Sequence, residues 1–310
     1  MSLALLFPGQ GSQFVGMGED LSHRYPKVRE VFSRASAALH EDLARLCFSG
    51  PAEVLKRTEN AQPAILTVSV AIYEVIQAEM KIDPKALAGH SLGEYTALVV
   101  SGALDLESAV HLVRLRGKLM EEACPAGTGG MGAILGLARP LVESLCREAC
   151  APGEVLVPAN FNSPEQIVIS GHKTAVAKAL KIASERGAKA SLPLEVSGPF
   201  HSPLMQTVET HLREALDQVT YNDLRLPVVA NFTGDFYRDK SVIPELLAKQ
   251  VDHPVLWEDS IRTLKKSGVD QIVEIGPGRV LSGLTRRIDR SIQVANVENL
   301  ESLEKLKTRS

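Results

Sequence analysis

Residues 86–100 have the sequence ALAGHSLGEYTALVV, in which a glycine-rich turn joins a short apolar run to a helix-forming segment. The turn places Gly89, Ser91 and Gly93 in the pattern Gly-x-Ser-x-Gly. Between a strand and a helix, this pattern is typical of a strained turn that exposes a nucleophilic serine. We therefore predict that Ser91 projects from the C-terminal end of a strand. The alternative is a glycine-rich turn whose serine only faces solvent.

The composition is that of a globular protein with a large core. The chain has 310 residues, 45% apolar and 23% charged, with a net charge of −3 and a pI near 6.3. This balance argues against nucleic acid or an anionic membrane as the main partner. No apolar run approaches about 18 residues, so we expect no membrane-spanning helix. The N-terminus lacks the features of a signal peptide, which favours a cytoplasmic protein.

The cysteines do not predict a disulfide framework or a metal site. There are four, at positions 47, 124, 146 and 150, and their spacing is irregular. None belongs to a Cys-x-x-Cys motif with a matching pair of histidines. We expect reduced, mostly buried thiols and no metal.

The order of predicted strands and helices divides the chain into two regions. Strand and helix patterns alternate in residues 1–126 and 197–310, which predicts one large α/β domain with a mainly parallel sheet covered on both faces. Residues 127–196 follow the order β-α-β-β-α-β, the ferredoxin-like pattern, so we predict an inserted small domain.

The expected elements follow from periodicity and from turn residues. The strands are 3–7, 86–88, 131–137, 154–159, 166–170, 189–196, 226–232 and 271–275, with a turn at 162–164. The helices are 31–46, 62–80, 94–100, 105–124, 139–150, 174–186, 204–219 and 255–266, one after 278, and a surface helix or frayed end at 298–310.

A serine hydroxyl attacks well only when a base takes its proton, so we searched the eight histidines for one. His201 lies in the sequence SGPFHSP, residues 197–203, a Pro- and Gly-stiffened loop at the predicted domain junction. Functional groups are common in such loops. His90 is adjacent to Ser91 and is predicted to be a packing or hydrogen-bonding neighbour. His201 is therefore the candidate base.

Arg116 lies on the apolar face of the predicted helix 105–124, three residues after Val113 and four after Leu112. A guanidinium buried there needs an anion, because an unpaired buried charge is strongly destabilising. Its partner is either a structural Asp or Glu, or a substrate carboxylate held by two parallel hydrogen bonds. The periodicity leaves both possibilities open.

The loop PGQGSQ, residues 8–13, follows the first predicted strand. It differs from a dinucleotide-binding fingerprint because Phe14 stands where the third glycine would be. We predict that this loop brings a backbone N–H group close to the nucleophile.

Six sequence blocks occur together and in order: PGQGSQ (8–13), GHSLGE (89–94), RLRG (114–117), NFNSP (160–164), FHS (200–202) and EIGPG (274–278). In these blocks, over nearly its whole length, the chain resembles the malonyl-CoA:acyl carrier protein transacylases and the acyltransferase domains of polyketide synthases. The resemblance implies an α/β-hydrolase-like large domain with an inserted ferredoxin-like domain, and a monomer. It also implies an enzyme of fatty acid synthesis that moves malonyl from malonyl-CoA to the phosphopantetheine thiol of acyl carrier protein, without a cofactor of its own.

The resemblance further implies a role for each block. Ser91 would carry the malonyl group as an ester, with His201 as general base and then general acid. The main-chain carbonyl of Gln250 would orient this histidine. Further implied roles are an oxyanion hole from the backbone N–H groups of Gln10 and Leu92, a carboxylate clamp from Arg116, and a pocket lined by Met120, Asn160, Asn162 and Phe200.

Two other function classes remain open. The first is a serine esterase or thioesterase with water as the acceptor, although a hydrolase has no need of a charged clamp. The second is a non-catalytic subunit that binds carrier protein. Carrier proteins are typically acidic, so a basic patch is expected; Arg286, Arg287 and Arg290 are candidates, or form only a solvated helix face.

Overall fold

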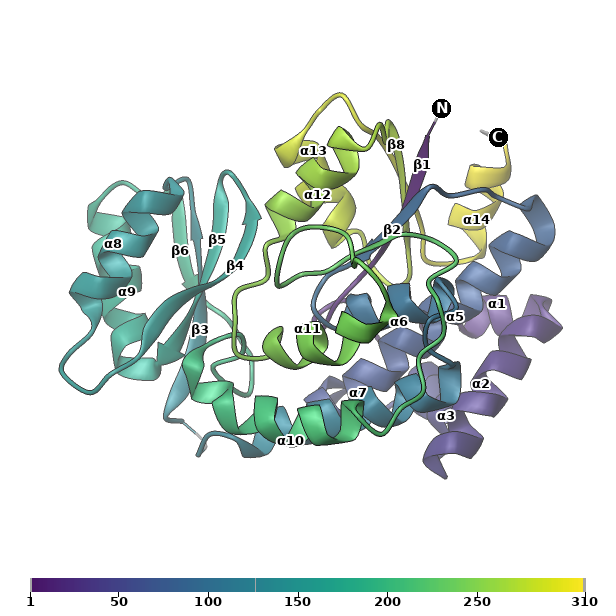
Figure 1. The fold of residues 1–310 in the computed structure, drawn as a ribbon, viewed down its shortest axis with the longest axis horizontal. Coiled ribbons are helices and arrows are strands. Elements are labelled where there is room, and N and C mark those ends of the chain that lie inside the picture. The colour runs from purple at the N-terminus through teal and green to yellow at the C-terminus, as the bar shows by residue number, and fades with distance from the viewer. Residues whose placement is uncertain (1, 126, 309–310) are drawn as a thin grey trace.

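The computed structural model describes residues 2–125 and 127–308. Those residues contain two β-sheets, one parallel and one antiparallel, in two units that lie side by side (Figure 1). The predicted fold class, an α/β protein with a mainly parallel sheet and a ferredoxin-like unit, is confirmed. The domain boundaries remain a prediction, and residue 126 lies outside the described residues.

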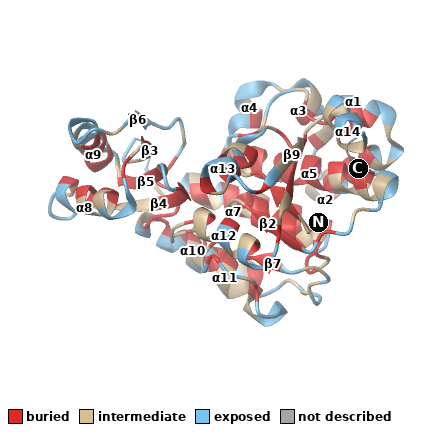
Figure 2. Ribbon diagram, turned by 90° about the horizontal axis from the view of Figure 1, so that it is seen from above, coloured by how far each residue is buried: buried red, intermediate tan, exposed pale blue. Residues whose placement is uncertain are grey.

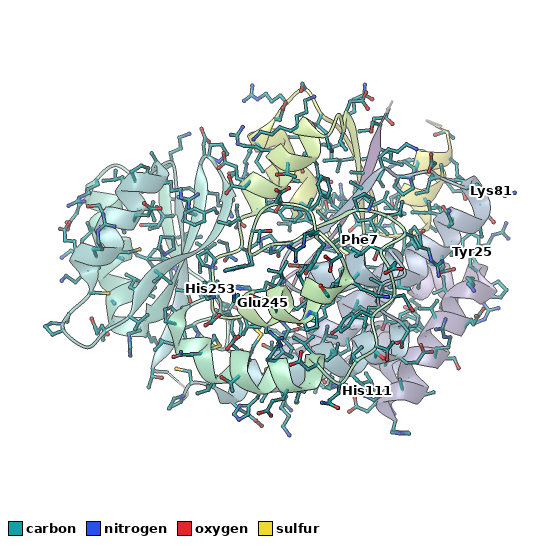
Figure 3. The ribbon with its side chains drawn as sticks, viewed as in Figure 1. Phe7, Tyr25, Lys81, His111, Glu245 and His253 are labelled. Carbon is teal, nitrogen blue, oxygen red and sulfur yellow. The ribbon has the colours of Figure 1, made fainter. Side chains whose placement is uncertain are left out.

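The large unit is built on a five-stranded sheet with the order β7-β2-β1-β8-β9, in which every neighbouring pair is parallel. Its strands are β1 (Leu3–Phe7), β2 (Ala86–Gly89), β7 (Val228–Val229), β8 (Gln271–Ile275) and β9 (Gln293–Val297). Because β1 and β2 are adjacent and parallel, the loops that follow Phe7 and Gly89 open at the same edge of the sheet. Phe7 is buried inside this unit (Figure 3).

Helices surround this sheet (Figure 1). They are α1 (Glu19–Arg24), α2 (Pro26–Leu39), α3 (Leu43–Ser49), α4 (Ala52–Lys56), α5 (Thr58–Met80), α6 (Leu92–Val100), α7 (Leu106–Glu122), α10 (Gln206–Leu216), α11 (Ile243–Lys249), α12 (Trp257–Lys266), α13 (Val280–Ile288) and α14 (Leu300–Lys307), with 3₁₀ turns η1 (Pro203–Met205) and η2 (Lys240–Val242). Asp105 caps α7 by accepting a hydrogen bond from the Ser108 N–H at 2.8 Å, so this helix starts where its sequence predicts.

The small unit has the order β3, α8, β4, β5, α9, β6 and a sheet order of β4-β5-β3-β6, antiparallel throughout. Its elements are β3 (Gly129–Leu135), α8 (Arg139–Ala149), β4 (Leu156–Ser163), β5 (Gln166–His172), α9 (Lys173–Glu185) and β6 (Ala190–Pro193). Both helices lie on the side away from the large unit (Figures 1 and 2). They pack on their own apolar core, which includes Ile134, Val142 and Ile169.

Helix α5 lies in the core of the large unit, among elements whose buried residues are red in Figure 2. Among the described residues, it is the single helix that is long and apolar enough to cross a membrane. However, 67% of its most apolar 18-residue window is buried inside the protein, as in the core helix of a globular protein.

Four predicted elements are wrong in extent. The strand expected at 189–196 is shorter, because its pairing with β3 runs only from Ala190 to Pro193. The helix expected at 31–46 is two helices, because His40 takes a φ of 53° and ends α2 while Asp42 caps α3. The turn expected at 162–164 begins later, because Asn162 and Ser163 belong to β4 and Ser163 pairs with Gln166 of β5.

The strand expected at 226–232 forms a ladder only at β7, because the chain turns back at Ala230, whose carbonyl accepts from the Gly234 N–H. Strand β9 was not predicted, since its sequence QVANV is short and half polar. The end of the predicted tail at 309–310 lies outside the described residues.

Candidate active site

Ser91 stands on the sharp turn between β2 and α6, with φ 52° and ψ −108°. A non-glycine residue held at positive φ is strained, and such strain is common at functional sites. The turn is so tight that a Cβ on Gly89 would lie 1.9 Å from the Gly93 carbonyl carbon and oxygen, and one on Gly93 would lie 2.1 Å from the Phe7 carbonyl oxygen. A side chain at either position would clash with the main chain, so both positions require glycine.

Asn231, in the loop after β7, fixes this turn from outside. Its Oδ1 accepts from the Ser91 N–H at 2.6 Å, and its Nδ2 donates to the Gly89 carbonyl at 2.7 Å. Asn231 is fully buried, so both hydrogen bonds are shielded from water. Asn231 was not predicted, because nothing local in the sequence marks it.

The structure brings His201 to Ser91. The Ser91 Oγ lies 2.9 Å from His201 Nε2, and His201 Nδ1 lies 2.7 Å from the carbonyl oxygen of Gln250. A carbonyl oxygen only accepts, so Nδ1 carries the proton and Nε2 is free to accept the serine proton. Burial, with the nearby Arg116 charge, lowers the pKa of His201 to about 3. The imidazole is therefore neutral near pH 7, as a general base must be.

Arg116 is buried in the same place, with 1% of its surface exposed. It donates to Gln62 Oε1 at 2.7 Å, to Gln250 Oε1 at 2.8 Å and to Ser91 Oγ at 3.0 Å. Burial lowers the pKa of this guanidinium. None of the ion pairs among residues 2–125 and 127–308 involves Arg116, and its Nε has no hydrogen-bond partner there. Within the described residues, no carboxylate is thus in direct contact with this cation.

Gln250 makes contacts that its predicted role did not include. Beyond the carbonyl that faces His201, its side-chain Nε2 donates to the Ser91 carbonyl at 2.9 Å and to Glu94 Oε2 at 2.7 Å. Glu94 is fully buried and also accepts from the Asn231 N–H and the Tyr237 hydroxyl. Glu94, Gln62 and Tyr237 were not predicted. For Glu94 and Gln62 the available signal was a polar residue within the apolar pattern of α6 and of α5, respectively.

Gln10 and Leu92 are placed next to the nucleophile. Leu92 is the first residue of α6, and helix N-termini direct unpaired N–H groups and positive potential outward. The loop after β1 packs on the serine turn, since a Cβ on Gly9 would lie 2.5 Å from the His90 carbonyl oxygen. The Gln10 side chain donates to Thr58 Oγ1 at 3.0 Å, which anchors this loop to α5.

A cleft of about 950 Å³ opens above these residues, between the two units. Its lining includes Ser91, His201, Arg116 and Gln10 from the large unit, together with the predicted pocket residues Met120, Asn160, Asn162 and Phe200. The units are joined at this point by main-chain bonds between Val255 and β4.

His90 lies against the same cleft as a neighbour of the site. Its Nε2 lies 2.8 Å from Asn162 Oδ1, and its ring packs on Trp257 with centroids 5.3 Å apart. This agrees with a packing and hydrogen-bonding residue rather than a base. Arg286, Arg287 and Arg290 are exposed on α13 or just after it. Arg287 donates to Gln166 Oε1 at 2.9 Å, and Gln166 lines the cleft.

No group of three His, Cys, Asp or Glu side chains is arranged to hold a metal ion within the described ranges. In chemical terms, the cleft contains a serine, a neutral histidine, two candidate N–H donors for an oxyanion and a buried cation. This set can carry out acyl transfer through a covalent ester, with an anionic group of the substrate held by the cation.

Comparison with known proteins decides the family. A profile of the acyl transferase domain family matches residues 4–308. The malonyl CoA-acyl carrier protein transacylase of Bacillus subtilis (strain 168) is 45% identical over 302 residues, covering 97% of this chain and 95% of the relative. The chain belongs to the acyl transferase family, with the malonyl CoA-acyl carrier protein transacylases.

Other relatives of this acyltransferase agree. The malonyl CoA-acyl carrier protein transacylase of Escherichia coli (strain K12) is 48% identical over 285 residues, covering 92% of each chain. The crystal structure of an acyl carrier protein S-malonyltransferase from Vibrio cholerae superposes with a TM-score of 0.96 at 43% identity, covering 99% of this chain and 100% of that one. A type II PKS acyl-carrier protein in complex with its malonyl-transacylase matches with a TM-score of 0.97 at 42% identity, covering 100% of both transacylase chains.

Proposed function

We propose that this acyltransferase transfers the malonyl group from malonyl-CoA to the phosphopantetheine thiol of acyl carrier protein, in fatty acid synthesis, through a malonyl ester on Ser91. The observation that carries the proposal is the position of Arg116. This fully buried guanidinium forms no ion pair with any residue that the structure describes and lies 3.0 Å from the nucleophile, where an acyl group with a free carboxylate would supply an anion in direct contact.

In the first half-reaction, Ser91 Oγ attacks the thioester carbonyl of malonyl-CoA while its proton passes to His201 Nε2. The negative charge that forms on the carbonyl oxygen is stabilised by the N–H groups of Gln10 and Leu92, each contributing about 3 kcal/mol. The C–S bond then breaks, and the leaving CoA sulfur takes the proton from His201. The product is the malonyl ester of Ser91 and free CoA.

In the second half-reaction, the carrier-protein thiol gives its proton to His201 Nε2 and its sulfur attacks the ester carbonyl. The same N–H groups stabilise the oxyanion. The C–O bond to Ser91 breaks, and Ser91 Oγ recovers the proton from His201. Arg116 holds the free carboxylate through both halves, and Met120, Asn160, Asn162 and Phe200 surround the acyl group.

No cofactor is needed for this chemistry, since the carrier protein brings the phosphopantetheine. We further infer a cytoplasmic monomer that acts on two soluble partners, malonyl-CoA and acyl carrier protein, and on neither membrane nor nucleic acid. The net charge of −3 is in keeping with the last point.

The test is intact-mass measurement after brief incubation with malonyl-CoA and then acyl carrier protein. A malonyl increment that requires Ser91, absent in Ser91→Ala, and that disappears as malonyl-carrier protein forms supports transfer. If the increment decays equally fast without carrier protein and yields free malonate, the protein is a hydrolase. If wild type gains no increment, a non-catalytic carrier-binding role replaces the proposal.

A further inference from the structure

Arg116 and Glu94 are both fully buried, yet neither takes part in an ion pair in the part of the chain that the structure describes. Arg116 donates only to neutral acceptors: the side-chain oxygens of Gln62, Gln250 and Ser91. A guanidinium and a carboxyl group are thus buried in one site without touching each other. Burial raises the pKa of Glu94 to about 7, although its hydrogen bonds and the charge of Arg116 act in the opposite direction, so the carboxylate is ionised from about neutral pH upward.

Glu94 in turn accepts only from neutral donors. Its Oε2 accepts from the Asn231 N–H at 3.0 Å and from Gln250 Nε2 at 2.7 Å, and its Oε1 accepts from the Tyr237 hydroxyl. The Asn231 N–H and Gln250 Nε2 require an acceptor, which Oε2 provides, whereas the Tyr237 hydroxyl can donate to Oε1 or accept from it.

One amide stands between the two charges. Gln250 presents Oε1 to Arg116 and Nε2 to Glu94, at 2.8 Å and 2.7 Å. The reverse orientation of this amide would place N–H against the guanidinium and oxygen against the carboxylate, so the two charges together fix the side chain. Gln250 is itself fully buried, which strengthens each of these interactions.

We propose that Glu94 is the counter-charge of Arg116, held one amide away so that the guanidinium is compensated in charge while its N–H groups stay available for the substrate carboxylate. The inference rests on the proposed function. A direct ion pair would occupy the donor fork of Arg116, whereas an uncompensated buried cation would destabilise the protein. The Gln250 spacer avoids both. Glu94 is a positioning residue, because it acts on the substrate only through Gln250 and Arg116.

This arrangement also limits how tightly malonyl is held. The bound carboxylate adds a second negative charge to a cluster with one cation, so Glu94 weakens its binding and favours its release to the second thiol. An acetyl group adds no charge and is not subject to this effect. Removing the charge of Glu94 should therefore strengthen the binding of malonyl-CoA and leave that of acetyl-CoA unchanged.

The first experiment uses Glu94→Gln. The glutamine oxygen can still accept from Asn231 and Gln250, while its NH₂ group donates to the Tyr237 hydroxyl, which rotates to accept. In a Ser91→Ala background that cannot be acylated, and at about pH 8, where Glu94 is ionised, we expect Glu94→Gln to lower the Kd of malonyl-CoA about tenfold and not that of acetyl-CoA. An unchanged Kd for malonyl-CoA, or an equal change for acetyl-CoA, overturns the proposal.

Glu274→Gln is the control for the loss of a buried charge, and its folding is checked by circular dichroism, because the new NH₂ group leaves one of two N–H partners without an acceptor. Glu274 is another fully buried carboxyl; it accepts from the N–H groups of Leu281 and Ser282 at the start of α13 and does not bond to Gln250. The same loss of a buried charge there should leave the ratio of the two Kd values unchanged. A ratio that shifts as much as in Glu94→Gln would mean that any lost buried charge has this effect, which also overturns the proposal.

A second variant tests the spacing and does not depend on the folding of the first. Gln62→Glu places a carboxylate at a position 2.7 Å from Arg116 Nη1. We expect this direct pair to raise the Kd of malonyl-CoA about tenfold, even when combined with Glu94→Gln, which restores the net charge. A double variant that binds malonyl-CoA like wild type would show that the spacing is irrelevant. Failure of the proposed function gives a different result from failure of this inference. In that case wild type gains no malonyl increment in the intact-mass measurement, whatever the Kd values of the variants.

Discussion

His201 is oriented by the main chain of Gln250, with its Nδ1 2.7 Å from the carbonyl oxygen. In a Ser-His-Asp triad the third member is a carboxylate, which also stabilises the imidazolium that forms during the reaction. A neutral carbonyl fixes the tautomer but supplies no charge, and the low pKa of His201 is in keeping with this. Gln250 uses its side chain for a second purpose, to contact Arg116 and Glu94. The functions of its carbonyl and of its side chain can therefore be separated by mutation.

Gln250→Ala should keep the carbonyl that orients His201 and lose the amide that holds Arg116. We expect malonyl loading on Ser91 to fall about tenfold to a hundredfold from misplacement of the clamp. His201→Ala removes the base and should cost about a thousandfold or more. Single-turnover loading, followed by intact mass, measures both. If acetyl loading falls as far in Gln250→Ala as in His201→Ala, the side chain is needed to orient the base as well.

Arg116→Ala should abolish selection for a free carboxylate. The variant leaves a cavity that no longer demands an anion, so we expect malonyl loading to fall by about a thousandfold, as for loss of a buried charged hydrogen-bond pair, while acetyl-CoA becomes a better relative substrate. Competition between the two thioesters at equal concentration measures the preference. Unchanged malonyl preference would show that Arg116 serves only the structure.

How far the sequence predicts this site depends on how local each signal is. Ser91 is marked by the turn pattern of its own neighbours, and Arg116 by its place on an apolar helix face. Glu94 and Asn231 meet only after β2 and β7 have paired, since their 3.0 Å hydrogen bond joins segments 137 positions apart. Periodicity carries no information on such a contact. The length of strand β7 was overestimated for a different reason: a local turn, in which the Gly234 N–H donates to the Ala230 carbonyl, ends the ladder.

Gly93→Ala should disrupt the serine turn, because its Cβ would lie 2.1 Å from the main-chain oxygen of Phe7 and backbone cannot move aside easily. We expect a loss of about 3 kcal/mol or more in the free energy of unfolding, with loss of loading. Gly283→Ala on α13 is the control, since no described atom beyond its chain neighbours and its own helix backbone lies within 4 Å of its Cβ. There we expect a gain of about 0.5–1 kcal/mol from helix propensity. Denaturant unfolding measures both, and equal losses would contradict the steric argument.

The buried histidine makes stability depend on pH in a defined window. The pKa of His201 falls from 6.5 to about 3 because burial and Arg116 disfavour its charged form. Between these values the unfolded chain binds a proton that the folded protein does not, so the contribution is complete above pH 6.5 and is lost as pH falls toward 3. We expect this one group to add a slope of at most about 1.4 kcal/mol per pH unit to the free energy of unfolding. The measurement is urea unfolding at a series of pH values for wild type and His201→Gln, which cannot titrate there. The free energy of unfolding of wild type minus that of His201→Gln should fall as pH drops below 6.5. If this quantity stays constant down to about pH 4, His201 is protonated normally in the folded protein.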